Sequence, residues 1–570
     1  MKRHTTIFAA LLLATMLTAC GTSRTTTTTT AQVQAQALPA AYGEATYEAS
    51  SFTTVPIDLE NLQESYADGK IIVTENELTI AITNISDTKW NFTFTGTTAK
   101  SVRLESRTDS MATLQGVSIN ASEKGSGPAF WYSSSSDLYL VLSGNNTIND
   151  NKVSYKAADG SLWDTTLTKA ALYAQGNMLI GGDGSLDINA VPKHGVFCAD
   201  VLTIKSGMVT VTLDSGTSDG TCIKATNGYI QEGGTVTLTG LNAEAGSENK
   251  GLKVDGEESA YGKGKGYIVI NEGTFTSTTS GKGLSAGFDS AEDGDTASKE
   301  NDPWADVYIN GGVITIKTTA TPREDSSPTA DDGVSPEGIE GKRNVIICGG
   351  IVTVETTDDG INSSEGDLTI NGGTIFAHSS LNDGIDSNGK IAINGGTVIA
   401  LGAEVPEDGI DCDDDSAFTY NGGTIIALGG GNNAPSGSAT TGYCLTTGGG
   451  MAGHGARPAL PLEGERPERP QGNMKGFAGA VGAFSSSDTF AVTDAGGNVL
   501  LAFTLPEGYT ASNMLLASSS LKDGMNVTLT KDAQVEGDLA FGVLYQGVVT
   551  IAGGTSSLVS INGHTTTITL

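Results

Sequence analysis

The sequence predicts an all-β fold, in which a parallel β-helix is followed by a C-terminal β module. Three observations indicate this fold: a strand–turn–strand phrase recurs along the chain, helical patterning is nearly absent, and glycine accounts for 76 of the 570 residues. Thr and Ile recur beside those glycines, a combination typical of short strands joined by tight turns. We therefore expect many short strands and no helical layer.

The N-terminus has the features of an export signal, expected over residues 1–20. A basic start is followed by the apolar run Ile7–Leu17, which is too short to stay in a bilayer as a spanning helix. The run ends at Leu17-Thr18-Ala19-Cys20, which resembles the bacterial lipobox, in which the cysteine is acylated. We expect a lipid on Cys20 as the only membrane contact, and an extracytoplasmic location on the cell envelope. The alternative is an ordinary signal peptide that ends at a cysteine by chance.

The central repeat consists of two phrases that advance together along the chain. The first places Gly-Gly or Asn-Gly-Gly after an apolar or aromatic residue, in Ile309–Val313, Ile370–Thr374, Ile393–Thr397 and Tyr420–Thr424. The second precedes the first and places Gly-Ile before a polar residue, in Gly338–Glu340, Gly360–Asn362, Gly384–Asp386 and Gly409–Asp411. A repeat of this length is too short for a strand–helix–strand unit, so successive coils should stack in parallel.

Stacked coils place equivalent residues about 4.8 Å apart. The apolar residue of the second phrase, or of the same slot in earlier coils, then forms one inward ladder: Val196, Ile223, Leu252, Leu284, Ile339, Ile361, Ile385 and Ile410. A leucine-rich repeat can share this period, but its pattern of Leu and Asn is missing.

These features divide the chain into six predicted segments. After the signal come a Thr-rich tether (21–46), N-terminal capping coils (47–165), the parallel β-helix (166–427), a Gly/Pro-rich mobile loop (428–480) and the C-terminal β module (481–570). The tether cannot bury a core. The module should cover the open end of the helix, because an uncovered strand edge invites aggregation.

The charge of the chain restricts its partners. There are 65 acidic and 32 basic residues, a formal net charge of −33. Such a surface repels phosphate backbones, which argues against a nucleic-acid partner and favours cations or neutral polymers.

Acidic residues recur in register at the C-terminal end of the repeat. Two carboxylates at stacking distance repel by roughly 3 to 4 kcal/mol at an effective dielectric near 20, so several such pairs require a counter-charge. Calcium meets this need because it accepts roughly six to eight oxygen ligands in adaptable geometry. The predicted ligands are Asp358, Asp359, Asn362, Asp383, Asp386, Asp408, Asp411 and Asp413. The alternative is that these residues are solvated turn formers.

These features together resemble a known family. The Asp-Gly-Ile and Asn-Gly-Gly-Thr coils, the lipobox and the C-terminal strands with Ala552–Thr555 are similar to the clostridial family of cellulose- and pectin-binding β-helix lipoproteins, over residues 50–570. The resemblance implies a right-handed parallel β-helix related in shape to polysaccharide lyases, with calcium bound on the helix and attachment to plant cell-wall polymers without required catalysis. The chain departs from the family in its Gly/Pro loop and in inserts near Asp289 and Asp325.

Three functions remain in competition. The leading interpretation is a surface-anchored, calcium-dependent protein that binds cellulose or polygalacturonate and is not an enzyme, with Lys253 and Lys282 as candidate sugar contacts. The second is a pectate-type lyase, in which calcium acidifies a proton and Lys253, Lys282, Lys342 or Arg343 removes it. The third is a structural or adhesive stalk that calcium makes rigid.

Overall fold

The structure is a computed structural model that describes residues 49–122, 127–151, 170–191, 193–217, 219–242, 247–257, 266–289, 306–323, 333–412, 417–436, 438–447, 484–486 and 488–568. The predicted signal peptide, Cys20 and the tether lie outside this part of the chain. Within it the fold is all-β, as predicted: long parallel sheets, no α-helix and one short 3-10 turn at Ala49–Ser51. The described residues contain no helix with the length and apolar character needed to cross a membrane.

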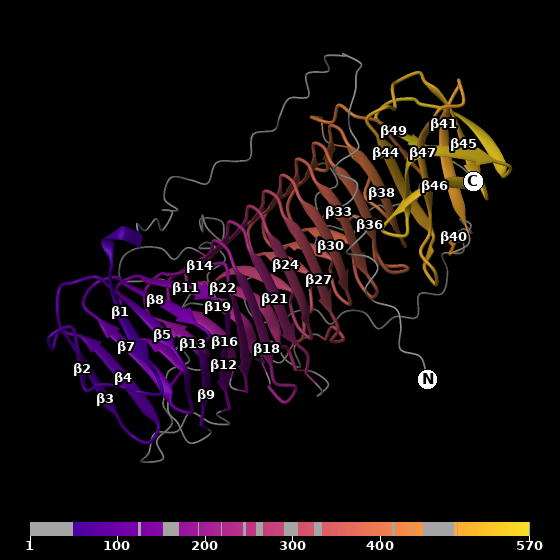
Figure 1. Ribbon diagram of the computed structural model, residues 1–570. Coiled ribbons are helices and arrows are strands. Elements are labelled where there is room, and N and C mark those ends of the chain that lie inside the picture. The colour runs from indigo at the N-terminus through magenta and orange to yellow at the C-terminus, as the bar shows by residue number, and fades with distance from the viewer. Residues whose placement is uncertain are drawn as a thin grey trace, which may run out of the picture. The chain divides into compact units, whose positions relative to one another are not determined.

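Each coil adds one strand to each of three sheets, which we name B, A and C in chain order. In one coil these are β34 (Ile385–Ser387), β35 (Ile391–Ile393) and β36 (Thr397–Leu401). Figure 1 shows the coils succeeding one another from the indigo to the orange strands. The second repeat phrase therefore enters sheet B, and the Asn-Gly-Gly phrase turns the chain from sheet A into sheet C.

Sheet A is parallel throughout. Its strands, in spatial order, are β1 (Thr53–Asp58), β5 (Trp90–Thr95), β8 (Ser110–Gln115), β11 (Leu138–Ser143), β14 (Met178–Gly182), β17 (Val201–Ile204), β20 (Gly228–Gln231), β23 (Tyr267–Ile270), β26 (Val307–Ile309), β29 (Val345–Ile347), β32 (Leu368–Ile370), β35 and β37 (Thr419–Tyr420).

Sheet B is parallel from β4 onward and begins with antiparallel pairs. Its strands are β2 (Ser65–Tyr66), β3 (Ile71–Glu75), β4 (Thr79–Asn84), β7 (Ser101–Ser106), β10 (Phe130–Tyr132), β13 (Ala170–Ala174), β16 (His194–Cys198), β19 (Thr221–Ala225), β22 (Lys250–Glu257), β25 (Leu284–Asp289), β28 (Ile339–Gly341), β31 (Ile361–Ser363) and β34.

Sheet C is parallel up to β38, where strands from the C-terminal part join it. Its strands are β6 (Thr97–Thr98), β9 (Ser118–Ala121), β12 (Asn145–Asp150), β15 (Ser185–Ala190), β18 (Met208–Leu213), β21 (Thr235–Gly240), β24 (Thr274–Thr279), β27 (Val313–Thr318), β30 (Ile351–Thr356), β33 (Thr374–Ser379), β36, β38 (Thr424–Gly429), β44 (Asn513–Ser518), β39 (Cys444–Thr446) and β49 (Thr565–Thr567).

The predicted inward ladder is confirmed residue by residue. Val196 pairs with Ile223, and the pairing continues through each predicted residue as far as Ile385 and Ile410. All eight side chains are fully buried in one core that runs along the coils. Side chains alternate across a strand, so their neighbours in sequence point away from the core.

The Gly-Gly corners have a steric cause. The second glycine adopts a left-handed conformation, with φ of +90° at Gly373 and +85° at Gly396. A Cβ on the first glycine of that corner, Gly395, would lie 2.8 Å from the carbonyl oxygen of Asn371 on the preceding coil. Both positions therefore favour glycine, one for its backbone and one for the close approach of the next coil.

The parallel sheets begin at β1, inside the segment predicted as capping coils (47–165), so most of that segment has the same arrangement as the central repeat. Among the described strands of that segment, the antiparallel pairs are β2 with β3 and β3 with β4. The corners of these early coils carry one left-handed glycine, at Gly96, Gly116 and Gly144, in place of the Gly-Gly pair. The repeat phrase is absent for that reason, although the coil is present.

The C-terminal residues cover the last coil. β44 pairs antiparallel with β38, and β39 pairs with β44, so part of the segment predicted as a mobile loop (428–480) is a strand of sheet C. The strands of a further antiparallel sheet are β46 (Gln534–Ala540), β47 (Leu544–Ala552), β42 (Val499–Thr504), β41 (Thr489–Asp494), β45 (Asn526–Lys531) and β48 (Thr555–Ser560), and β40 (Phe484–Ser485) pairs with β43 (Thr510–Ala511). These strands bury a second core against the outer side of sheet C, including Phe376, Ile399 and Phe503.

Candidate functional site

The residue after each ladder residue forms a row on the outer side of sheet B. Successive partners in this row are Phe197, Lys224, Lys253, Ser285, Glu340, Asn362 and Asp386. The row thus changes from aromatic through basic to acidic along the stack, and its acidic end contains the predicted ligands Asn362 and Asp386. The acidic end is the candidate functional site.

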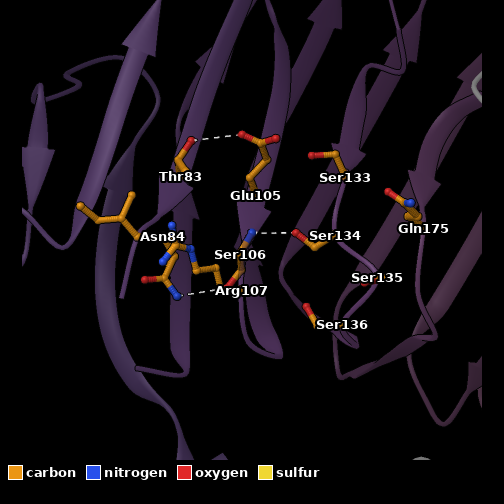
Figure 2. A pocket seen from close by; sticks show the side chains of 11 residues that line it. Thr83, Asn84, Glu105, Ser106, Arg107, Ser133, Ser134, Ser135, Ser136 and Gln175 are labelled. Carbon is orange, nitrogen blue, oxygen red and sulfur yellow. Dashed lines mark hydrogen bonds between the residues drawn. The ribbon is translucent and has the colours of Figure 1, made fainter. Parts of the chain in front are cut away.

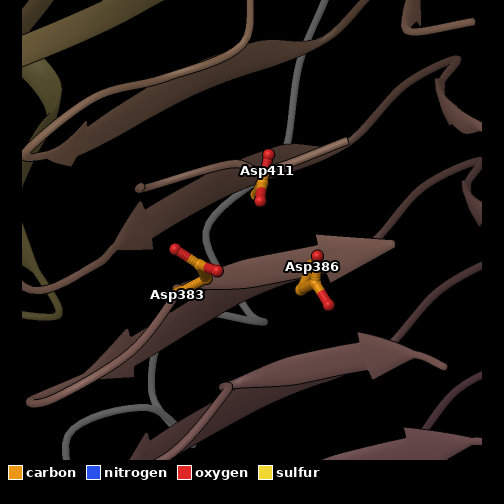
Figure 3. A group of neighbouring side chains, drawn as sticks. All are labelled: Asp383, Asp386 and Asp411. Atoms are coloured by element: carbon orange, nitrogen blue, oxygen red, sulfur yellow. The ribbon is translucent and has the colours of Figure 1, made fainter. Parts of the chain in front are cut away.

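Three carboxylates converge at that end. Asp383 precedes β34, Asp386 lies on it, and Asp411 follows Ile410, which bridges to Ile385. One carboxylate oxygen from each of these three residues lies within 4.8 Å of the others. Figure 3 shows Asp383 and Asp386 on one coil and Asp411 on the next. Asp383 is buried and the other two are half-buried.

A buried amide lies one coil earlier, beside another carboxylate. Asn362 donates from Nδ2 to Glu337 Oε1 at 2.9 Å and to Asp359 Oδ2 at 3.2 Å. Its side chain is only 6% exposed, yet its Oδ1 accepts no hydrogen bond. A buried polar atom without a hydrogen-bond partner lowers the stability of the folded protein. A bound group that contacts this oxygen would remove that cost.

The electrostatics of the buried carboxylates also favour a bound cation. Burial, and then the neighbouring carboxylates, raise the pKa values of Asp359 and Asp383 well above the usual range. No lysine or arginine of the described residues forms an ion pair with either one. Carboxylate and amide oxygens are the ligands that calcium prefers, so the donor set fits that ion.

The remaining predicted ligands are distributed around this cluster. Asp358 is buried and accepts a hydrogen bond from Asn382 Nδ2 at 2.8 Å. The backbone N–H of Asp408 donates to Asp383 Oδ1 at 2.5 Å, which places Asp408 directly beside the cluster. Asp413 lies outside the described residues.

A buried ion-pair network separates the acidic end from the basic coils. The Lys282 ammonium group contacts Glu337 and lies 3.2 Å from Glu340 Oε1, and Lys342 lies 2.8 Å from the same oxygen. Burial and then Glu340 raise the pKa of Glu337 to about 7. Burial opposes the ionisation of Glu340, but Lys282 and Lys342 outweigh it and hold its pKa well below the usual range.

The four candidate bases are all held in ion pairs. Burial alone would lower the pKa of Lys282, yet Glu337 and Glu340 raise it above its usual value. The pKa of Lys342 is raised too, chiefly by Glu340. Lys253 pairs with Asp255 at 2.9 Å, and Arg343 makes two hydrogen bonds to Asp306. A lysine with a raised pKa is a poor proton acceptor, and Lys282 is too buried to present its ammonium group to a polymer.

Sequence reasoning missed Asp255 and Asp306 as partners of these bases. Neither belongs to a repeat phrase. For Lys253 a signal was available, because Asp255 lies two residues later on the same strand and alternation places both side chains on one face. For Arg343 no signal distinguished Asp306 from the other acidic residues.

Comparisons with known proteins give a family match and a structural neighbour. A family model described as carbohydrate-binding domain-containing protein matches residues 75–383, more than half of the chain. No curated protein shows significant sequence similarity. Among solved structures, the polysaccharide lyase-like protein from C. thermocellum, a gadolinium derivative, is 16% identical with a TM-score of 0.29, and the match covers 58% of this chain and 95% of that chain.

Proposed function

We propose that this chain, which belongs to the family of carbohydrate-binding domain-containing proteins, is a calcium-dependent binder of plant cell-wall-type polysaccharide. Cellulose and polygalacturonate are the proposed polymers. The lipid on Cys20 is the proposed anchor that holds the protein on the cell envelope.

One observation carries the calcium part of the proposal: Asp383, Asp386 and Asp411 converge, and Asn362, whose buried Oδ1 accepts no hydrogen bond, pairs in register with Asp386. Asp383, Asp386 and Asp411 would hold the ion, with Asp359 and Asn362 next to it. A bound calcium ion would neutralise these carboxylates and offer coordination positions to sugar hydroxyl or carboxylate oxygens. The positions of the ligands relative to one another are fixed, because each ligand lies within two residues of a buried ladder residue.

Binding is better supported than cleavage. A lyase requires a base within hydrogen-bond reach of a proton on the sugar, with a pKa matched to that task. Lys282 and Lys342 have raised pKa values, and Lys253 and Arg343 are occupied by carboxylates. A binder has no such requirement, because separate coils can contact separate sugars of a long polymer.

A glycan array with and without chelator tests the proposal and separates it from the structural stalk. Binding to β-linked or uronate polysaccharides that weakens when calcium is chelated is the expected result. A protein that folds but binds no polysaccharide under either condition would support the stalk instead. Binding that chelation leaves unchanged would remove calcium from the proposal.

A further inference from the structure

A groove of about 450 Å³ lies at the N-terminal end of sheet B, away from the acidic cluster (Figure 2). It is lined where β4, β7, β10 and β13 end. The lining is polar, with Glu105, Ser106, Arg107, the serine run Ser133–Ser136 and Gln175 among its residues.

The register of the coils brings these residues together. Thr83 pairs with Glu105 on the next coil, and Asn84 pairs with Ser106. The backbone N–H of Ser133 donates to Leu104 O, and that of Gln175 donates to Tyr132 O, so both continue the same positions on later coils. Because carboxyl ends of parallel strands meet at one edge, residues distant in sequence line a single groove.

The floor of the groove is fixed by internal hydrogen bonds. Ser134 Oγ accepts from the backbone N–H of Ser106 at 2.7 Å, and Ser136 Oγ donates to Thr108 O at 3.0 Å. The Glu105 carboxylate is held by Arg103 at 2.5 Å. A preformed polar surface of this kind loses little conformational entropy when it binds a ligand.

Three side chains at the rim have exposed hydrogen-bonding groups. Arg107, Ser135 and Gln175 are all exposed. Arg107, which follows β7, makes no ion pair with any residue in the described part of the chain, whereas Arg103 on β7 pairs with Glu105. An arginine without a carboxylate partner is notable in a chain with a net charge of −33.

We propose that this groove is a second carbohydrate-binding subsite, which takes a sugar residue carrying a carboxylate and requires no metal ion. This inference rests on the proposed polysaccharide binding and adds a location and a sugar class to it. The planar fork of a guanidinium group matches a carboxylate with two parallel hydrogen bonds. Serine hydroxyls and the Gln175 amide supply donors and acceptors for the sugar hydroxyls.

The two sites lie far apart on the same sheet. Eight strand steps separate β10 from β34 in sheet B, which corresponds to roughly 40 Å at about 4.8 Å per step. A long polymer can occupy both sites, and the second contact then gains from a high effective concentration. Short oligosaccharides should therefore reveal the groove, whereas long polymers report both sites together.

Calorimetric titration of the chelated protein with a galacturonate trisaccharide tests the groove alone. Binding by the wild type is expected to persist in chelator. Arg107→Ala should weaken it by about tenfold or more, because a charge-assisted hydrogen bond is lost. The affinity of Arg107→Lys for the trisaccharide should lie between those of the wild type and Arg107→Ala. The matched control is Lys522→Ala, which removes an exposed cation from the connection between β44 and β45 and should leave the trisaccharide affinity unchanged.

The possible outcomes are distinguishable. If the wild type binds long polygalacturonate only with calcium and shows no chelator-resistant trisaccharide binding, the groove proposal fails and the proposed function stands. If neither polymer nor trisaccharide binds under any condition, both fail. Equal trisaccharide affinity in wild type and Arg107→Ala, or equal affinity for a neutral cellulose trisaccharide, would also overturn the proposed acidic-sugar subsite.

Discussion

Asn362 pairs in register with Asp386 on the next coil, so a buried amide oxygen without a hydrogen-bond partner precedes a carboxylate of the candidate metal site. Asp359, Asn362 and Asp386 together form a continuous strip of possible oxygen ligands on the outer side of sheet B. The ladder residues Ile361 and Ile385 fix the spacing of this strip, because they are buried in the same register.

The first prediction concerns metal content. Asp383→Asn combined with Asp386→Asn should remove at least one calcium ion while keeping side-chain volume, because two charged ligands become neutral. Elemental analysis of protein equilibrated with calcium measures this directly. Asp187→Asn, an exposed residue on β15, is the matched control and should retain the full content. Equal calcium content in all three proteins would exclude Asp383 and Asp386 as ligands.

The second prediction concerns pH. An acid whose pKa is raised by folding binds protons that the unfolded chain has already released, so stability falls as pH rises through the raised pKa. Burial first, and neighbouring carboxylates second, raise the pKa values of Asp359 and Asp383. The melting temperature of calcium-free protein should therefore increase as pH is lowered from about 7 towards about 5, above the ordinary Asp value of about 3.9.

Two comparisons isolate this effect from the general negative charge of the protein. Asp359→Asn with Asp383→Asn should flatten the pH dependence in chelator. Added calcium should raise the melting temperature most near neutral pH, because protons compete with the metal at lower pH. A wild-type melting temperature that falls on acidification in chelator over this range would contradict the assigned pKa directions.

The third prediction concerns the inward ladder. Ile385→Asp should cost about 3 to 5 kcal/mol, because it leaves an uncompensated charge in the core. Chemical denaturation measures the loss, and hydrogen exchange should show the coils next to β34 opening first, since each coil contacts only its neighbours. Leu381→Asp introduces the same charge just before the same strand, at a side chain that is 52% exposed, and should have little effect. Equal stability of the two variants would show that the ladder register is wrong.

The fourth prediction concerns the Gly-Gly corners. Gly396→Ala should destabilise the protein by about 1 to 3 kcal/mol through backbone strain at φ +85°. The added Cβ would also lie 2.7 Å from Gly373 O, and this clash should lower the stability further. Gly553→Ala has a similar left-handed φ of +66° with no atom within 4 Å of the added Cβ, so it measures the strain alone. The denaturation midpoint of Gly396→Ala should be the lower one. Identical midpoints would mean that the preceding coil does not restrict the corner.

The sequence predicted those parts of the structure that follow from periodicity. Ile361 and Ile385 share a slot in the repeat, so their stacking, and the outward position of Asn362 and Asp386, followed from side-chain alternation alone. The early coils were predicted only as capping coils (47–165), because single glycines such as Gly116 replace the Gly-Gly phrase there. The degree to which side chains of the outer row, such as Glu340 and Asn362, are buried could not be predicted, since it depends on packing outside the repeat.

The groove was equally invisible in the sequence. Arg107, Ser135 and Gln175 share no motif, and the strand register alone brings their coils together. The ion pairs of Lys253 and Arg343 likewise depend on Asp255 and Asp306, which lie outside the repeat phrases. The candidate bases Lys253 and Arg343 are therefore occupied by carboxylates in the structure.

The central claim is that the protein binds polysaccharide through calcium without cleaving it. The most direct measurement is retention of the wild type on immobilised polygalacturonate and on cellulose, with calcium and with chelator, while ultraviolet absorbance records any unsaturated uronate in solution. We predict retention with calcium, loss of at least part of it with chelator or with Asp383→Asn and Asp386→Asn combined, and no unsaturated product. Steady accumulation of unsaturated product, or retention that neither chelator nor the double variant alters, would contradict the claim.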